Sequence, residues 1–497
     1  MKKQEGVEKV NRKHNRLAQA VLAAAMVGTG TVGLAGLAGT AASAEPGGVD
    51  QTPVMGWSGW SFLRLGADTA QVEGEASALV STGLANYGYR YVNIDDGWYQ
   101  CPGPQGPNVD QYGRWVVNTA NYPNVGAQNG IQALAAYVHS LGLKFGIYET
   151  PGISKQAVAQ NTPVLGTSYT ADEIVANRQD NNYNCGGMMA LDYSSPGAQA
   201  YVDSVVDELA SWGVDYVKLD GITDRNAPDI RAWSLAIKQS GRPMVLNITQ
   251  GHYNEAIAPV LDRYANQWEF TPDIEINGPD EGSANSCNYP PYTGCLSVFP
   301  LTSYTHWMDR FDAVARWQPW GGPGGFNDYD SIEVGDGPAD SGMSLAAEES
   351  QLSLWSLGSA PLILGSDLSA SVTNAYGTSA GLDPTDLSLL ENKQVIEVDQ
   401  DAIDASRISD SGNAQVFGKV EQSGDGIVGL FDTSTGIGGP SLTISTSASA
   451  VGVRSDKVGY RLLNLWTGQV SYAGPAGLIT ASVPPEGVAL FRVTPLP

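Results

Sequence analysis

The middle of the chain alternates between short apolar runs and longer amphipathic stretches, and this alternation limits the folds that it can adopt. Runs of three to five residues with the pattern of β-strands recur eight times between Val54 and Gly365. They cover residues 54–57, 91–94, 144–148, 216–219, 244–247, 265–268, 325–327 and 362–365. Between them, residues 69–84, 131–141, 196–212 and 229–240 carry apolar residues at helical spacing. Eight strands that alternate with helices close most naturally into a parallel (β/α)8 TIM barrel.

The pattern changes after Asp401. Short strand-like segments separated by Thr, Ser and Gly turns follow, at residues 415–420, 426–431, 442–444, 460–464 and 488–493. We therefore predict an α/β chain with a catalytic-type barrel at residues 45–400 and a C-terminal antiparallel β-sandwich at residues 401–497. A sandwich of this size could bind carbohydrate, but a stabilising or packing role is the expectation.

The first 44 residues have the pattern of a secretion signal. Basic residues precede an apolar stretch rich in Ala and Gly from Leu17 to Leu37, and Ala42-Ser43-Ala44 matches the small-x-small cleavage pattern. A transmembrane anchor is the alternative, but the small residues and the cleavage pattern favour removal. We expect a secreted, extracellular protein with no membrane attachment after processing.

Charge and cysteine content narrow the possible partners. The formal net charge of −25 argues against a nucleic-acid partner, because phosphates would be repelled. Export makes disulfides plausible, and four cysteines allow three pairings that the sequence cannot distinguish. Cys287 and Cys295 flank a short loop and are paired here, which leaves Cys101 with Cys185. We expect no metal site, because there is no Cys-x-x-Cys motif and no pair of His residues at ligand spacing.

Acidic and aromatic residues follow the ends of six predicted strands. One such residue could be a helix cap, but six sets of them at one face of a barrel predict a binding pocket. They lie at residues 56–60, 95–99, 148–149, 218–220, 268–273 and 327–330. Carboxylates bind hydroxyl groups and indole rings stack on apolar ring faces, so a carbohydrate is the expected ligand. No phosphate-binding loop, nucleophile elbow or nicotinamide fingerprint competes with this interpretation.

Two of these carboxylates form a candidate catalytic pair that needs no cofactor. Asp220 ends the fourth strand and Asp273 follows the sixth, so the two lie on opposite sides of a central pocket. One carboxylate can attack an anomeric carbon while the other protonates the leaving oxygen and then activates water. Lys218, on the same side of its strand as Asp220, would keep Asp220 ionised. The apolar neighbours of Asp273 could raise its pKa and make it the acid, although either Asp could instead cap a helix.

The chain resembles glycoside hydrolase family 27, the family of retaining α-galactosidases and α-N-acetylgalactosaminidases. The resemblance covers residues 52–401 and the C-terminal sandwich. It rests on motifs that occur in family order, at residues 52–57, 91–98, 144–148, 213–220, 322–330, 360–368 and 392–396. Two of them read Tyr91-Val92-Asn93-Ile94-Asp95-Asp96-Gly97-Trp98 and Tyr216-Val217-Lys218-Leu219-Asp220.

The resemblance implies a role for each residue that matches the family motifs. Asp220 would be the nucleophile and Asp273 the acid/base. Asp95 and Asp96 would bind the O4 and O6 hydroxyls, and Lys218 would bind O3 or O4. The remaining pocket residues would be Trp57, which would stack on the sugar, together with Tyr148 and Asp330.

Several departures from the family pattern concern the side of the pocket that faces the sugar O2. Glu269 occupies the position of an Arg that contacts O2 in the family's α-galactosidases. The segment after the fifth strand, which reads the 2-substituent, contains Thr249, His252 and Tyr253 in place of the family's usual residues. We count these four residues among the substrate-binding candidates.

Three functions remain open from the sequence. The first is a retaining α-galactosidase, because Asp95-Asp96 favours a sugar with an axial O4 such as galactose. The second, motivated by Glu269 and His252, is another family activity: an isomaltodextranase acting on α-1,6-glucan or a β-L-arabinopyranosidase. The third is a non-catalytic carbohydrate-binding barrel, which the intact candidate pair disfavours.

Overall fold

The structure of the protein is a computed structural model that describes most of the chain after the predicted signal. It describes residues 48–180, 182–250, 255–275, 300–335, 337–370, 381–454 and 456–497. The predicted signal at residues 1–44, the pair Cys287–Cys295, and His252 and Tyr253 lie outside these residues. No helix in the described part has both the length and the apolar composition needed to cross a membrane.

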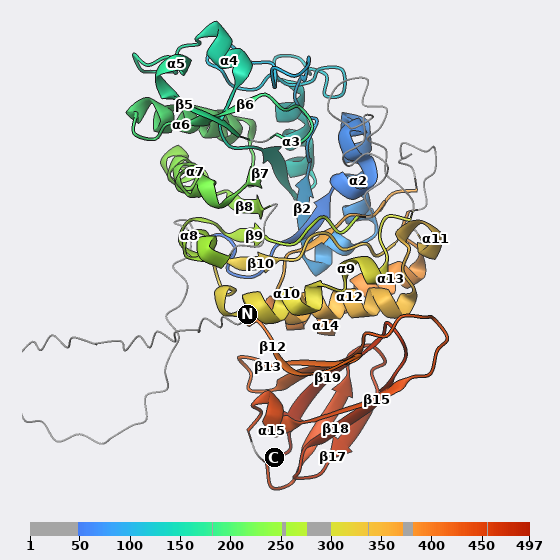
Figure 1. The fold of residues 1–497 in the computed structure, drawn as a ribbon. Coiled ribbons are helices and arrows are strands. Elements are labelled where there is room, and N and C mark those ends of the chain that lie inside the picture. Colours follow the sequence, from blue (N-terminus) through green and yellow to red (C-terminus); the bar gives the residue numbers. More distant parts are fainter. Residues whose placement is uncertain are drawn as a thin grey trace, which may run out of the picture. The chain divides into compact units, whose positions relative to one another are not determined.

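Eight parallel strands form the central sheet, in the order β10-β9-β8-β7-β3-β2-β1-β11 (Figure 1). They are β1 (Met55–Ser58), β2 (Tyr89–Asn93), β3 (Lys144–Glu149), β7 (Tyr216–Ile222), β8 (Val245–Gln250), β9 (Gln267–Glu269), β10 (Phe326–Asp328) and β11 (Leu362–Leu364). Ile332, just past β10, closes the ring through a parallel bridge to Leu364. Each predicted strand is present with its ends within three residues of the prediction, and the (β/α)8 fold is confirmed.

The four predicted helical stretches form α2 (Thr69–Ser81), α3 (Gly130–Ser140), α6 (Pro196–Trp212) and α7 (Ala227–Ser240). Their ends carry clear signals: Asp68 and Gln71 form a capping box at α2, and Pro196 is the first residue of α6. Gly213 ends α6 in the left-handed conformation, with φ 90°. The other α-helices are α1 (Trp60–Leu63), α4 (Lys155–Gln160), α5 (Ala171–Ile174), α8 (Ala258–Tyr264), α9 (Tyr304–Trp307), α10 (Arg310–Trp317), α11 (Gly337–Ser341), α12 (Leu345–Leu357), α13 (Pro384–Leu390), α14 (Lys393–Gln400) and α15 (Ala448–Val451).

The long connection between β3 and β7 is more ordered than the sequence suggested. It contains a three-stranded antiparallel sheet of β4 (Ile153–Ser154), β5 (Val175–Asp180) and β6 (Met188–Leu191), together with α4 and α5. The predicted disulfide between Cys101 and Cys185 is present and joins this connection to the loop after β2.

Side chains that point into the barrel divide it into an apolar end and a polar end. Val54, Tyr91, Tyr216, Val245 and Ile363 form a separate apolar cluster near the N-terminal ends of their strands. Because side chains alternate along a strand, Lys218 and Asp220 lie on the same face of β7 as Tyr216, farther along the strand. The C-terminal end of the barrel therefore collects the charged groups.

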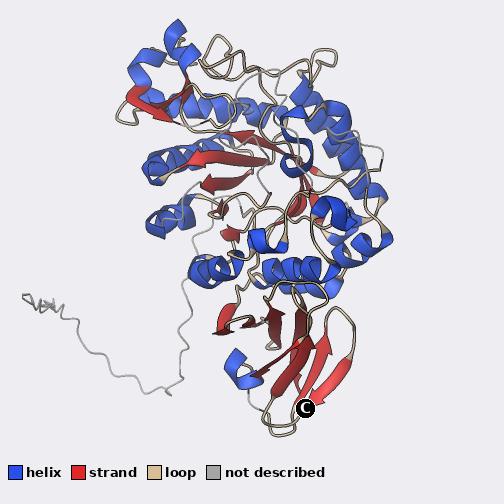
Figure 2. Cartoon of the chain, turned by 45° about the vertical axis from the view of Figure 1, so that its right-hand side comes forward, coloured by secondary structure: helices blue, strands red, loops and turns tan. Residues whose placement is uncertain are grey.

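The C-terminal domain is an antiparallel sandwich, as predicted, and Figure 2 shows it as mostly strand and loop. One sheet has the order β12-β13-β14-β19-β16-β17, and the other pairs β15 with β18. The strands are β12 (Ser406–Ser411), β13 (Ala414–Val420), β14 (Gly426–Asp432), β15 (Leu442–Ser447), β16 (Tyr460–Asn464), β17 (Val470–Ala473), β18 (Leu478–Val483) and β19 (Val488–Pro495). The segments named in the sequence analysis did not include β12, β17 and β18; β12 and β17 are largely exposed, and β18 has exposed residues between its buried ones. The domain boundary at residue 401 stays a prediction.

A buried lysine links the sandwich to the barrel. Lys419 on β13 is 4% exposed, and its ammonium donates hydrogen bonds to the carbonyl oxygens of Val398 and Ile403 at 2.5 and 2.7 Å. Burial raises the pKa of Asp404 to about 7, and the charge of Lys419 opposes that rise. Asp404 in turn accepts a hydrogen bond of 2.9 Å from Asn327 on β10.

We predict that Lys419→Met destabilises the protein, because it leaves the buried carbonyl oxygens of Val398 and Ile403 without their donor and removes the positive charge near Asp399 and Asp404. Each unpaired buried acceptor costs about 1–3 kcal/mol in the free energy of unfolding, measured by urea denaturation at neutral pH. Arg407→Met is the matched control. Arg407 also joins the two domains, but its partner Asp312 is 77% exposed, so the loss should stay below about 1 kcal/mol. Equal losses for the two variants would contradict the prediction.

Candidate active site

Asp220 lies near the C-terminal end of β7, where the backbone departs from regular strand geometry. The pairing of β7 with β8 shifts register between Leu219 and Ile222, and Gly221 has a φ of 73°. Only glycine adopts this conformation without strain. It lets the Gly221 N–H donate to Asp220 Oδ1 at 2.6 Å, so the backbone itself holds the carboxylate.

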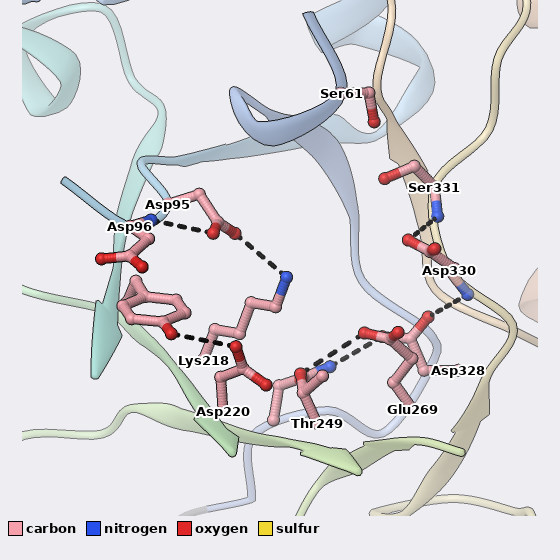
Figure 3. Close-up of polar contacts among 12 residues, drawn as sticks. Ser61, Asp95, Asp96, Lys218, Asp220, Thr249, Glu269, Asp328, Asp330 and Ser331 are labelled. Atoms are coloured by element: carbon pink, nitrogen blue, oxygen red, sulfur yellow. Dashed lines mark hydrogen bonds and ion pairs between the residues drawn. The ribbon is translucent and has the colours of Figure 1, made fainter. Parts of the chain in front are cut away.

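The other oxygen of Asp220 is also held. The Tyr148 hydroxyl, at the end of β3, donates to Asp220 Oδ2 at 2.9 Å. Lys218, two residues earlier on β7, donates to Asp95 Oδ2 at 3.0 Å (Figure 3). The pairs Lys218–Asp95 and Tyr148–Asp220 thus lie side by side at the C-terminal ends of β2, β7 and β3, with Lys218 and Asp220 on the same strand.

Burial raises the pKa of Asp220 to about 6. The charge of Lys218 and the hydrogen bonds from Gly221 and Tyr148 oppose this rise. The sequence analysis expected Lys218 to favour the ionised form of Asp220, and the structure confirms that direction. Asp220 is therefore ionised at neutral pH, as a nucleophile must be.

Asp96 is held by a group that the sequence analysis did not find. Its carboxylate accepts hydrogen bonds from Tyr99 Oη at 2.5 Å, Gly97 N at 2.7 Å and Asn184 Nδ2 at 2.6 Å. Asn184 belongs to the connection between β3 and β7, next to Cys185 of the disulfide. Burial raises the pKa of Asp96 to about 7, and the hydrogen bonds from Tyr99 and Asn184 counteract this rise. The predicted disulfide between Cys101 and Cys185 indicated that these two loops lie together, but it did not identify Asn184 as a partner of Asp96.

Across the pocket lies a second group of carboxylates. The carboxylate oxygens of Glu269, Asp273 and Asp330 lie within 4.8 Å of one another. Figure 3 shows Glu269, Asp328 and Asp330 facing Asp95, Lys218 and Asp220. Glu269 is 4% exposed and accepts a hydrogen bond of 3.3 Å from Thr249 Oγ1. Three ionised carboxylates this close would repel one another strongly, so the group shares protons or binds a cation.

Asp330 carries a strained backbone and two backbone hydrogen bonds. Its φ of 76° is unusual for a residue other than glycine. This conformation places its carboxylate to accept hydrogen bonds of 2.6 Å from both the Ile274 and the Ser331 N–H groups. Strain of this kind is characteristic of functional sites.

Asp273 sits on a backbone segment that several side chains hold. His306 Nε2 donates to the Asp273 carbonyl oxygen at 3.3 Å, and Thr302 Oγ1 donates to the Ile274 carbonyl oxygen at 2.7 Å. The Arg310 guanidinium donates to the Pro272 carbonyl oxygen. Burial, together with the charges of Glu275 and Asp330, raises the pKa of Asp273 well above its usual range. The expected rise is present, and charged neighbours add to the burial that the sequence suggested.

Two sets of predicted residues are not brought into this arrangement. Trp57 is fully buried and donates its indole N–H to the Ser366 carbonyl oxygen at 2.9 Å. It pairs in register with Val92 and Leu364, two buried apolar residues. Its stacking role therefore stays a prediction, as do the roles of His252 and Tyr253, which lie outside the described residues.

The geometry supports acid/base and nucleophilic chemistry without a cofactor. One side of the pocket holds an ionised carboxylate with both oxygens hydrogen-bonded, and the other holds a carboxyl whose environment favours its protonated form. Proton sharing accounts for the closeness of Glu269, Asp273 and Asp330, so we assign no metal to them.

We predict that Asn184→Ala lowers kcat/KM by about ten- to a hundredfold, because Asp96 loses a hydrogen bond to a charged group, worth about 1.5–3 kcal/mol. The same loss of Asn184 raises the pKa of Asp96 further, so the defect should deepen as the pH falls from 8 to 6. Steady-state kinetics at several pH values measures both effects. Asn108→Ala is the control, because Asn108 donates to Gln100 in the loop after β2 and does not contact Asp96. An equal defect in both variants would show that the loop, and not Asn184, is responsible.

Comparisons with known proteins agree with this site. A family model described as "Alpha galactosidase A" matches residues 52–162 and 295–401. A second, described as "Alpha galactosidase C-terminal beta sandwich domain", matches residues 411–493. The "Probable alpha-galactosidase" of Dictyostelium discoideum is 30% identical, with 93% of this chain and 97% of the relative covered. The "Alpha-galactosidase" of Oryza sativa is 29% identical, with 90% and 86% covered.

Among solved structures, a family 27 β-L-arabinopyranosidase from Geobacillus stearothermophilus is similar, with a TM-score of 0.74 and 26% identity. The match covers 90% of this chain and 97% of that one. Alpha-galactosidase I from Mortierella vinacea shares the fold, with a TM-score of 0.65, 23% identity and 90% and 98% covered. The chain belongs to glycoside hydrolase family 27 and is a glycoside hydrolase of the α-galactosidase kind.

Proposed function

We propose that the protein is a secreted, retaining α-galactosidase that removes terminal α-D-galactosyl residues. One observation supports the mechanism most directly: Asp220 is an ionised carboxylate held by Tyr148 and Gly221, opposite a carboxyl, Asp273, whose environment favours a proton. The relatives that are named α-galactosidases support the choice of sugar.

The proposed reaction has two steps. In the first, Asp220 attacks the anomeric carbon, the bond from that carbon to the glycosidic oxygen breaks, and Asp273 gives its proton to the departing oxygen. In the second, Asp273 takes a proton from water, the water oxygen attacks the anomeric carbon, and Asp220 leaves. Two inversions return the original anomeric configuration. Lys218 and Asp95 lie beside the nucleophile, where they can bind sugar hydroxyls.

Secretion is supported by the sequence of the N-terminus and by the disulfide. Residues 1–44 carry the basic, apolar and small-residue regions of a signal peptide. The bond between Cys101 and Cys185 fits an oxidising compartment.

The second candidate is a β-L-arabinopyranosidase, which the similar Geobacillus stearothermophilus structure favours. β-L-arabinopyranose has the ring hydroxyls of α-D-galactopyranose but lacks its hydroxymethyl group. The family resemblance assigns Asp95 and Asp96 to the O4 and O6 hydroxyls, and three hydrogen bonds hold the Asp96 carboxylate. A carboxylate pair that binds O6 would favour the sugar that has the hydroxymethyl group. An isomaltodextranase remains a further alternative from the sequence.

We predict that kcat/KM for p-nitrophenyl α-D-galactopyranoside exceeds that for p-nitrophenyl β-L-arabinopyranoside at least tenfold, with no sugar released from dextran. Parallel assays of the three substrates test this choice. Asp220→Asn and Asp273→Asn provide the controls for contaminating activity. Higher activity on the arabinoside or on dextran would show that the protein is not primarily an α-galactosidase. A wild-type protein that binds galactose without hydrolysing the galactoside would be a carbohydrate-binding barrel.

We also predict a bell-shaped dependence of kcat/KM on pH. Asp220 acts in its ionised form and its pKa is raised to about 6, so kcat/KM should fall as the pH is lowered through about 6. Asp273 acts in its protonated form, so kcat/KM should also fall as the pH rises through its raised pKa. Initial rates between pH 4 and pH 10 measure both limbs, and NMR of the first-formed product should show the α-anomer. An acidic limb near pH 4, the ordinary range for Asp, would contradict the role given to buried Asp220.

A further inference from the structure

Glu275 is a buried carboxylate that the two-step mechanism does not use. It lies two residues after Asp273 and is 1% exposed. Its Oε1 accepts a short hydrogen bond from Ser61 Oγ of α1, while Oε2 is buried and has no hydrogen-bond partner among the residues that the structure describes. Because Ser61 holds this carboxylate and neither step of the mechanism uses it, we consider how its charge acts on a neighbouring group.

The Asp273 carboxyl faces more negative than positive charge. Among these charges, that of Glu275, from the same segment, raises the pKa of Asp273 most. The charge of Asp330, from the segment after β10, follows. Lys218 and Asp220, both from β7, also act on it, and Glu269 of β9 lies within 4.8 Å. Lys218 opposes the effect of the carboxylates on the pKa of Asp273, but Lys218 is paired with Asp95.

Hydrogen bonds decide which carboxyl groups carry the charge and which carry the proton. Asp330 accepts two backbone N–H bonds. Burial raises the pKa of Glu275, but the Arg64 guanidinium and the Ser61 hydroxyl oppose that rise. The Asp273 carboxyl accepts no hydrogen bond from the part of the chain that the structure describes, and its pKa is raised well above its usual range. We therefore assign the proton to Asp273 and the charge to Glu275.

The geometry points to Glu275 as a positioning residue that keeps the proton on Asp273 while Asp220 is ionised. This inference rests on the proposed roles of Asp220 and Asp273. Ser61 holds the Glu275 carboxylate in place, and Ile274 between the two acids is held by Asp330 and Thr302. Glu275 takes no part in any bond that forms or breaks. It determines the pH above which Asp273 no longer has a proton to give to the glycosidic oxygen.

Glu275→Gln tests this inference, because it removes the charge and keeps the shape and the acceptor for Ser61. The basic limb of kcat/KM should move to lower pH by about one unit or more, the usual effect of a nearby like charge, while the acidic limb stays in place. Above that limb, hydrolysis of melibiose should fall about tenfold. Hydrolysis of 2,4-dinitrophenyl α-D-galactopyranoside, whose leaving group needs no proton, should stay within about twofold of the wild type.

Three further variants separate the possible outcomes. Ser61→Ala should move the basic limb in the same direction but less, and it provides the test if Glu275→Gln does not fold. Glu208→Gln, which removes a partly buried carboxylate of α6 paired with Arg114, should leave the limb in place.

Asp273→Asn tests the proposed function separately: it should abolish melibiose hydrolysis. If Asp273→Asn is inactive on melibiose but the basic limb is the same in Glu275→Gln and Ser61→Ala, the inference about Glu275 is wrong while the proposed function stands.

Discussion

The active site depends on the ion pair between Lys218 and Asp95. The pocket buries many carboxylates close together, and burial raises the pKa of each carboxyl group that it shields from water. Lys218 opposes that rise for Asp220, Glu269, Asp273 and Asp328 alike. The carboxylates of Asp95, Glu269, Asp220 and Asp330 in turn raise the pKa of Lys218 well above its usual range, against the effect of burial. Lys218 therefore stays charged in the barrel and limits the rise in the pKa of the acids around it.

Backbone N–H groups also hold carboxylates of the site through hydrogen bonds. Gly221, Gly97 and Ser331 each donate to the carboxylate of the residue just before them. A donor supplied by the backbone has a fixed position and loses no side-chain freedom when it binds. The backbone at the strand ends is irregular, with positive φ at Gly221, Gly97 and Asp330. This irregularity orients the N–H groups toward the carboxylates. The distorted strand ends are thus part of how the site separates ionised from protonated acids.

The sequence predicted the barrel well because its strands are short, apolar and bounded by recognisable turns. The same regularity placed Asp220, Lys218 and Asp95 at strand ends, where parallel strands bring them together. It could not place residues whose position depends on loops. Asn184, His306 and Ser61 reach the site from connections whose course no periodicity describes. The role of Trp57 cannot be decided from its residue type, because the register of its strand determines which face of the sheet its side chain occupies.

The buried Lys419 has a consequence for how this chain can be divided. Its ammonium completes hydrogen bonds for two carbonyl groups at the end of the barrel, and Asp404 beside it bonds Asn327, the residue before Asp328 of the pocket. The sandwich therefore supplies part of the packing at the end of the barrel, although it follows the barrel in the sequence. A chain shortened to the barrel alone would need another cation at this position. Recombination that joined the barrel to an unrelated C-terminal module would leave the same acids without a counterion.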